Sequence, residues 1–248
     1  SGAARDVSVT SRRHPALAQL GAVAAALGPL RDHVVFIGGA IAPALPTDPP
    51  FPRARPTSDV DAVAISPTYS DSHRLSEELR ARGFRRAVGD TRNAHRWYSP
   101  DNIAFDLVPA GEQLGASGNL WDSMARDTAV EVELEPGLII RHASAPAFLA
   151  LKWAAHDDRG RADPLASHDL EDILALLASR PIIRTEIGEA PLAIRTYLAD
   201  RARAFLDDSY MEDLLAAHLN NAQDPSRAIA AVRELIEWMA SNPRGSAL

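Results

Sequence analysis

Two short segments constrain the fold and chemistry of this chain more than any others. The first is an apolar run at 34–37 that leads directly into Gly38 and Gly39. The second begins with Asp59 and Asp61, two positions apart, and continues as another apolar run. Each apolar run predicts a β-strand. Side chains two positions apart on a strand leave it on the same face, so both carboxylates should point to one spot.

Two carboxylates that share one spot repel each other unless a cation lies between them. A glycine pair after a strand lets backbone N–H groups come close to a phosphate. Asp106 adds a third acid in the middle of the apolar run 103–108, where a charge rarely serves stability. A phosphate-binding turn beside a carboxylate metal site is equipment for phosphoryl or nucleotidyl transfer.

These motifs resemble the nucleotidyltransferase superfamily, which has a polymerase-β-like core. The resemblance rests on the glycine pair, the pattern Arg-x-Thr-x-Asp-x-Asp at 55–61, and the later apolar-Asp-apolar run. It implies that Asp59, Asp61 and Asp106 are catalytic and hold two Mg²⁺ ions, with Mn²⁺ as an alternative metal. It further implies that Asp106 helps to activate the attacking hydroxyl group.

Four residues around the acids are predicted nucleotide contacts: Gly38, Gly39, Arg55 and Thr57. Gly39 stands where the superfamily usually has serine, so phosphate binding there would depend on backbone N–H groups. Arg55 is expected to meet a phosphate, and Thr57 to cap or position the strand. Both also fit an ordinary loop in solvent.

A second set of residues lies further along the chain. Lys152 is the single lysine among 26 basic residues, which indicates a position that needs a compact ammonium group instead of a planar guanidinium. Asp169 and Asp172 are three apart in a predicted helix and therefore share one face. This pattern resembles the AbiEii and MenT branch of nucleotidyltransferases, the toxins of abortive-infection and toxin–antitoxin systems.

The resemblance to that branch implies that Lys152 meets the nucleotide phosphates and is catalytic. It also implies that Asp172, alone or with Asp169, orients the lysine or the acceptor. The alternative is an ordinary helix N-terminus with favourably placed acids.

The predicted fold is α/β (α+β): a small mixed sheet with flanking helices, followed by a helical C-terminal domain. Residues 1–115 are the predicted nucleotidyltransferase core. Residues 116–248 are the predicted helical domain, contributing Lys152 and Asp172 to a cleft between the two. The expected strands are 34–37, 59–65, 84–88, 95–99, 102–109, 130–134 and 138–141. The expected longer helices are 14–30, 70–82, 146–158, 167–179, 189–206, 209–219 and 226–240.

Composition limits the partners. The absence of cysteine and of any apolar run of 18 residues indicates a cytoplasmic protein without a membrane span. The net charge of −7 argues against a protein that lives on nucleic acid. Residues 80–96 are nevertheless basic, and this surface is either a solvated helix end or a rim that binds phosphates. The segment holds six arginines and one acid: Arg80, Arg82, Arg85, Arg86, Arg92, Arg96 and Asp90.

Three functions remain open from the sequence. The first is an AbiEii-like toxin that adds nucleotides from an NTP to a tRNA or another RNA end and has a cognate antitoxin as partner. The second is an enzyme that modifies a small hydroxylated molecule, as aminoglycoside adenylyltransferases do. The third is a non-catalytic nucleotide-binding protein, which an intact set of three acids disfavours.

Overall fold

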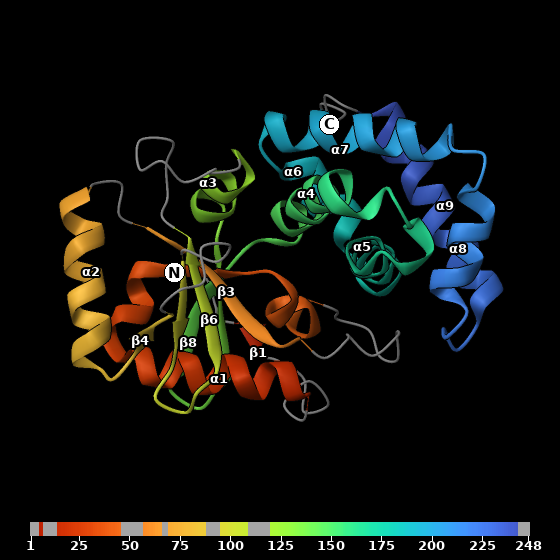
Figure 1. Ribbon diagram of the computed structural model, residues 1–248. Coiled ribbons are helices and arrows are strands. Elements are labelled where there is room, and N and C mark those ends of the chain that lie inside the picture. The colour runs from red at the N-terminus through yellow and green to blue at the C-terminus, as the bar shows by residue number, and fades with distance from the viewer. Residues whose placement is uncertain are drawn as a thin grey trace. The chain divides into compact units, whose positions relative to one another are not determined.

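The chain contains one mixed β-sheet with helices beside it and a separate group of helices (Figure 1). In this computed structural model, the described residues are 5–6, 14–45, 57–65, 69–87, 95–108 and 120–242. They divide into two compact units: residues 1–44 with 55–144, and residues 45–54 with 145–248. The predicted α/β class, a mixed sheet followed by helices, is confirmed.

The sheet of the first unit has eight strands among the described residues, in the order β1-β7-β8-β2-β3-β6-β5-β4. Pairing is parallel between β1 and β7, β8 and β2, and β3 and β6, and antiparallel elsewhere. The strands are β1 (Arg5–Asp6), β2 (Val34–Ile37), β3 (Asp59–Ala64), β4 (Arg85–Arg86), β5 (Arg96–Tyr98), β6 (Ala104–Val108), β7 (Val130–Glu135) and β8 (Leu138–His142).

Helices and short helical turns surround this sheet. Figure 1 shows α1 in red and α2 in gold, both lying beside the strands of this unit. The helix α1 packs on β3, β7 and β8, with Leu20, Val23 and Leu27 buried. The helical elements of this unit are α1 (Pro15–Leu27), η2 (Gly28–His33), η3 (Gly39–Ala44), α2 (Tyr69–Ala81) and α3 (Leu120–Asp127).

Capping residues define both ends of the helix α1. The His14 Nδ1 accepts a hydrogen bond from the Ala16 N–H at 3.2 Å, and Pro15 takes the first turn, where no N–H is needed. The helix ends at Gly28, whose φ of +54° disfavours a side chain. The predicted helix 14–30 is therefore shorter, and its last residues form the tighter turn η2.

The second unit is helical. The helix α4 packs against α5, α6 and α7, while α9 packs against α5, α7 and α8. Its elements are α4 (Ala145–Ala155), the π-helical turn η5 (His156–Gly160), η6 (Pro164–Ala166), α5 (His168–Ser179), α6 (Ile183–Glu189), α7 (Leu192–Leu206), α8 (Met211–Leu219) and α9 (Pro225–Ser241). Among the described residues, none of the helices combines the length and apolar character that a membrane span needs.

The compact units divide between Ser144 and Ala145, whereas the domain boundary predicted from the sequence lies at 115/116 and stays a prediction. The hairpin of β7 and β8 belongs to the first unit for a simple reason. Phe36 of β2 pairs with His142 of β8, so the hairpin extends the same sheet.

Candidate metal centre

Strand register brings the three predicted acids together. In the parallel pair of β3 and β6, Asp61 lies opposite Asp106 and Asp59 lies opposite Ala104. Asp59 and Asp61 share a face of β3 because they are two residues apart. One carboxylate oxygen from each of Asp59, Asp61 and Asp106 can be chosen so that all three lie within 4.8 Å of one another.

Such a group of oxygens suits a hard divalent cation. Mg²⁺ binds oxygen ligands at about 2.0–2.1 Å, so ligands on opposite sides of the ion are about 4.2 Å apart. An upper limit of 4.8 Å on the three oxygen–oxygen separations is compatible with ligands of one ion, and all three side chains are partly buried. The residues present therefore fit the metal that the sequence predicts, and they offer the carboxylate chemistry that Mg²⁺ and Mn²⁺ prefer.

A glycine beside the acids makes this arrangement possible. Gly38 follows β2 with a φ of +70°, and a Cβ added there would lie 2.1 Å from Asp61 Oδ2. Only glycine lets the carboxylate lie so close to the backbone at this φ. Gly39 begins η3 and is less restricted, since its added Cβ would be 3.5 Å from Thr57 Oγ1.

Thr57 acts on the first acid of β3. Its hydroxyl lies 3.1 Å from Asp59 Oδ1 and 3.2 Å from the Asp59 carbonyl oxygen and can donate to either. The residue thus holds the start of the strand and one carboxylate oxygen, as the capping role predicts. The other predicted contact in this loop, Arg55, lies outside the described residues.

Arg96 is the residue of this site that sequence reasoning did not single out. It lies on β5 opposite Asp106 of β6. Its Nε donates to Asp106 Oδ1 at 2.8 Å, and its Nη2 donates to Asp106 Oδ2 at 2.7 Å and to Asp59 Oδ2 at 2.8 Å. The hydrogen bond to Asp106 is the main reason that the pKa of Arg96 is raised above its ordinary value.

His95 precedes this arginine and is half-buried. Burial is the main cause that lowers the pKa of His95. The charge of Arg86 lowers this pKa further, while the charge of Asp106 opposes both. The local field therefore favours a neutral imidazole at the edge of the acid group.

The second predicted set of residues also comes together, within the second unit. Lys152 of α4 places its Nζ 3.1 Å from Asp169 Oδ1 and 2.5 Å from Asp172 Oδ2, both on α5. All three side chains are less than a tenth exposed. The lysine is therefore held between two buried carboxylates. Its predicted role at nucleotide phosphates stays a prediction.

Arg159 joins this cluster from the π-helical turn η5. It donates through Nε to Asp169 Oδ2 at 2.9 Å and through Nη2 to Asp169 Oδ1 at 3.1 Å. Burial acts to raise the pKa of Asp169, but the hydrogen bond from Arg159 and the charge of Lys152 outweigh it and lower that pKa. Asp169 thus has two cationic partners, one buried and one exposed.

Ser167 is the N-cap residue of α5 and contacts the π-helical turn η5 next to the Lys152 cluster. Its hydroxyl accepts from the Leu170 N–H at 3.3 Å and lies 2.8 Å from His156 Nδ1. Burial is the main cause that lowers the pKa of His156. Gly160 packs against this pair, because an added Cβ would lie 2.3 Å from the imidazole nitrogen. The contacts explain a well-packed turn and need no catalytic role.

The predicted basic surface is partly visible at one edge of the sheet. Arg80, Arg82, Arg85 and Arg86 are exposed at the end of α2 and on β4. The guanidinium groups of Arg80 and Arg86 lie 5.6 Å and 5.9 Å from the centre of the Trp97 ring. Arg92 and Asp90 lie outside the described residues, and Arg96 is engaged by the acids. Four arginines therefore remain as a surface that can meet phosphates.

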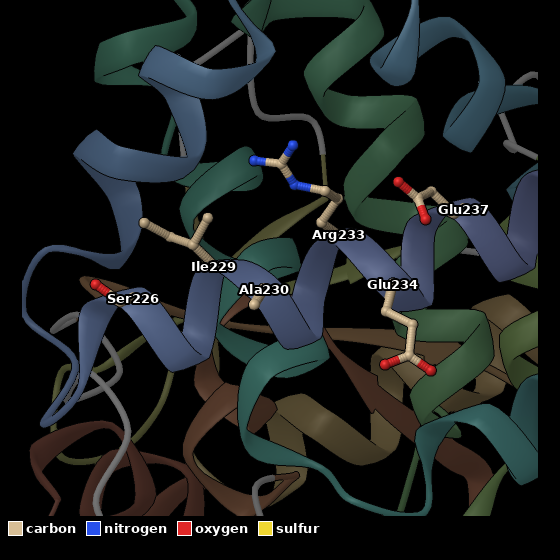
Figure 2. A pocket seen from close by; sticks show the side chains of 6 residues that line it. All are labelled: Ser226, Ile229, Ala230, Arg233, Glu234 and Glu237. Atoms are coloured by element: carbon tan, nitrogen blue, oxygen red, sulfur yellow. The ribbon is translucent and has the colours of Figure 1, made fainter.

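A hollow of about 430 Å³ lies along the outer side of α9 in the second unit (Figure 2). Its lining comes from one helix: Ser226, Ile229, Ala230, Arg233, Glu234 and Glu237. Two of its charged residues are already paired, Arg233 with Glu212 and Glu234 with Arg184. The hollow is shallow and offers no group of converging reactive side chains.

No family model and no curated protein matches this chain. Among solved structures, an antigenic nucleotidyltransferase-like protein from Paracoccidioides brasiliensis is 16% identical, with a TM-score of 0.48 over 88% of this chain and 94% of its own. JHP933 from Helicobacter pylori is 17% identical, with a TM-score of 0.44 over 95% of this chain and 94% of its own.

Both TM-scores are below 0.5 and both identities are below 25%, so neither likeness assigns a function. The function of this chain is therefore argued from its own residues.

Proposed function

We propose that this chain is a metal-dependent nucleotidyltransferase that moves a nucleoside monophosphate from an NTP to a hydroxyl group. One observation carries the proposal: carboxylate oxygens of Asp59, Asp61 and Asp106 lie within 4.8 Å of one another, beside the turn at Gly38 that only glycine can form without strain. Asp59, Asp61 and Asp106 would hold Mg²⁺, proposed as two ions, and the bound metal would supply positive charge that offsets the negative charge developing during transfer.

The residues of the chain have distinct tasks in this reaction. The acceptor oxygen forms a bond to the α-phosphorus, the bond from that phosphorus to pyrophosphate breaks, and the hydroxyl loses its proton. Asp106 helps to take up that proton. Thr57 holds Asp59 in position, and the backbone N–H groups of Gly38 and Gly39 would donate to the phosphates.

Lys152 is proposed to neutralise charge on the triphosphate, with Asp172 orienting its ammonium group. The close contact of Lys152 with Asp172 supports the orienting part of this proposal. A purely structural ion pair within the second unit accounts for the same contact. The two roles are separated by the lysine substitutions described in the Discussion.

We propose an RNA end, a tRNA in particular, as the acceptor, and an AbiEii-like toxin with a cognate antitoxin as the biological role. The exposed arginines Arg80, Arg82, Arg85 and Arg86 support an RNA acceptor, because phosphate contacts need cationic groups. The net charge of −7 favours the alternative, a small hydroxylated acceptor of the aminoglycoside type.

A labelling experiment tests the function. The protein is incubated with Mg²⁺ or Mn²⁺ and each α-labelled NTP in turn, with either total RNA or a set of small hydroxylated compounds. We expect transfer by the wild type and by Asp101→Ala, which removes an exposed acid of the same unit. Asp59→Ala and Asp61→Ala should abolish it while remaining folded.

The outcomes separate the possibilities. Labelled RNA supports the proposed acceptor, and a labelled small molecule alone supports the alternative. Transfer by either triad variant at a near-normal rate would overturn the metal assignment. Growth arrest on expression, relieved by a neighbouring gene, would support the toxin role.

A further inference from the structure

A cation of the chain itself lies within the acid group. The guanidinium of Arg96 makes three hydrogen bonds of 2.7–2.8 Å to Asp59 and Asp106. The three side chains are only 19–27% exposed. A charged, bidentate contact in such a partly buried position is among the stronger polar contacts in proteins.

These contacts occupy oxygens that a metal ion would use. Arg96 takes both oxygens of Asp106 and the Oδ2 of Asp59. The Oδ1 of Asp59 lies 3.1 Å from the Thr57 hydroxyl. A divalent cation bound by Asp59 and Asp106 would therefore meet the arginine at the same atoms.

The backbone keeps Arg96 at this place. Arg96 pairs with Asp106 across β5 and β6, and the next two residue pairs continue the same ladder. The Cα of Arg96 thus stays opposite Asp106, while its long side chain can change rotamer. Only the guanidinium has to move for the carboxylates to be released.

We propose that Arg96 is the resident counter-cation of Asp59 and Asp106, which a bound metal ion displaces, so that this arginine sets the metal affinity of the site. The inference rests on the proposed function for the presence of a metal. Without metal, the guanidinium offsets the mutual repulsion of carboxylates held close together by the sheet. With metal, the energy of these arginine contacts is lost, and the apparent affinity for the metal equals the intrinsic affinity multiplied by the fraction of sites in the released state.

Arg96 is therefore a positioning residue that acts through the acids. It keeps the carboxylates in place in the absence of metal and raises the ion concentration that is needed to fill the site. This role differs from that of Arg80, Arg85 and Arg86, which are exposed: Arg80 and Arg86 lie near the Trp97 ring, and Arg85 donates to Asn102 Oδ1.

Binding of Mn²⁺, followed by electron paramagnetic resonance and calorimetry, tests the proposal without any turnover. Arg96→Gln removes the competing charge, and Arg96→Lys keeps a charge without the fork. Arg126→Gln is the matched control, since Arg126 lies in the same unit and pairs with Asp127. We expect Arg96→Gln to bind Mn²⁺ about tenfold more tightly or better, because it gains negative charge and frees ligands. Arg96→Lys should lie between, and Arg126→Gln should match the wild type.

Thermal unfolding adds a second measurement on the same variants. Metal-free Arg96→Gln should unfold at a lower temperature than the wild type, because two partly buried carboxylates lose their partner. Added Mn²⁺ should stabilise this variant by a larger margin than the wild type. Equal or weaker Mn²⁺ binding by folded Arg96→Gln would overturn the proposal.

The wild type provides a test that no folding defect can obscure. The Nε–H signal of Arg96, assigned with Arg96→Lys in a sample labelled with ¹⁵N-arginine, should shift and exchange faster as Mg²⁺ is added. A signal unchanged at saturating Mg²⁺ would show that the guanidinium stays in place and would also overturn the proposal.

Failure of this inference is distinct from failure of the proposed function. Normal nucleotide transfer with an unchanged Arg96 signal would remove only the role of the arginine. Mn²⁺ binding that tightens in Arg96→Gln, without transfer from any NTP, would leave the role of the arginine intact and refute the transferase. No Mn²⁺ binding by any variant would refute both.

Discussion

At the scale of single residues, the candidate metal centre depends on a glycine, Gly38, because this position has no room for a side chain. Gly38 has a positive φ and leaves space that the Asp61 carboxylate fills. Alanine there would meet two penalties, the left-handed backbone and an overlap with Asp61 Oδ2. Gly39, one position along, meets neither penalty. Only the first of these two neighbouring glycines is therefore required by the backbone and by the Asp61 carboxylate.

Gly38→Ala and Gly39→Ala form a matched pair. We expect Gly38→Ala to destabilise the protein by more than about 1 kcal/mol, because alanine strains the backbone where φ is positive. It should also weaken Mn²⁺ binding by displacing Asp61. Gly39→Ala should change stability by less than about 1 kcal/mol. Urea unfolding and Mn²⁺ titration measure both effects, and equal behaviour of the two variants would contradict this account of the turn.

At the scale of elements, pairs of strands and pairs of helices create the charged clusters. The parallel pair β3 and β6 aligns Asp61 with Asp106, and the antiparallel pair β5 and β6 adds Arg96. In the second unit, α4 and α5 place Lys152 against Asp169 and Asp172. Each cluster joins acids with a cation from a neighbouring element.

Substitution of Lys152 separates a structural role from a role at the nucleotide. Lys152→Met leaves Asp172 and Asp169 buried without their shared ammonium and should cost about 3–5 kcal/mol of stability. Adding Asp172→Asn to it should recover part of this loss. Lys152→Arg should retain more stability than Lys152→Met, but the larger planar group should not restore transfer. Thermal unfolding and NTP titration are the measurements. Full transfer by Lys152→Arg would contradict the need for a compact ammonium.

Asp169 gives the second unit a defined response to acid. Its pKa in the folded protein lies below the ordinary value of 3.8, so folding favours the charged carboxylate. The stability that this group contributes is complete above pH 3.8 and is lost as the pH falls through the lower folded pKa. Asp169→Asn should therefore be less stable than the wild type near neutral pH, with a difference that shrinks below pH 3.8.

Chemical unfolding across pH 2.5–7 measures this difference, with Asp158→Asn as the control for an exposed acid of the neighbouring turn. A difference between Asp169→Asn and the wild type that stays constant down to the lowest pH would contradict the assignment.

Sequence patterns predicted the elements that build the candidate site. The strand 34–37 is confirmed, and strands were expected at the positions of β3 and β6, because short apolar runs bounded by polar residues have few alternatives. The helix α6 was not predicted, since its seven residues contain only Ile183 and Ile187 as core positions. The predicted helix 189–206 starts three residues too early, because α7 begins at Leu192 and ends at Leu206.

Contacts between elements were harder to predict. Arg96 was counted only within a basic segment, because its pairing with Asp106 depends on the register of β5 and β6, which the sequence does not state. Arg159 was missed for a different reason: it reaches Asp169 from a π-helical turn that the sequence pattern did not predict. The hairpin of β7 and β8 was expected, but its pairing with β2 was not, because Phe36 and His142 lie far apart in the sequence.

At the scale of the whole molecule, the distribution of charge matters more than its sum. The chain has a net charge of −7, yet exposed arginines gather at the end of α2 and on β4. Several arginines elsewhere are paired with acids, among them Arg203 with Asp200 and Arg233 with Glu212. A polyanion such as RNA would therefore find its most favourable contacts on the first unit.

Reversing two of these arginines tests that expectation. Arg85→Glu with Arg86→Glu should weaken RNA binding and labelling while Mn²⁺ and NTP binding at the acids persist. Each single-stranded phosphate contact contributes about 0.7 to the slope of log affinity against log salt. The double variant should flatten this slope by about 1.4 if each arginine meets one phosphate. Arg203→Glu with Arg227→Glu makes the same change of charge on the second unit and should leave the slope unchanged.

Equal RNA labelling by the wild type and by the Arg85→Glu, Arg86→Glu variant would show that RNA binds to another surface. Labelling of a small hydroxylated compound, but of no RNA, by the wild type would replace RNA with a small acceptor, for which these arginines are not needed.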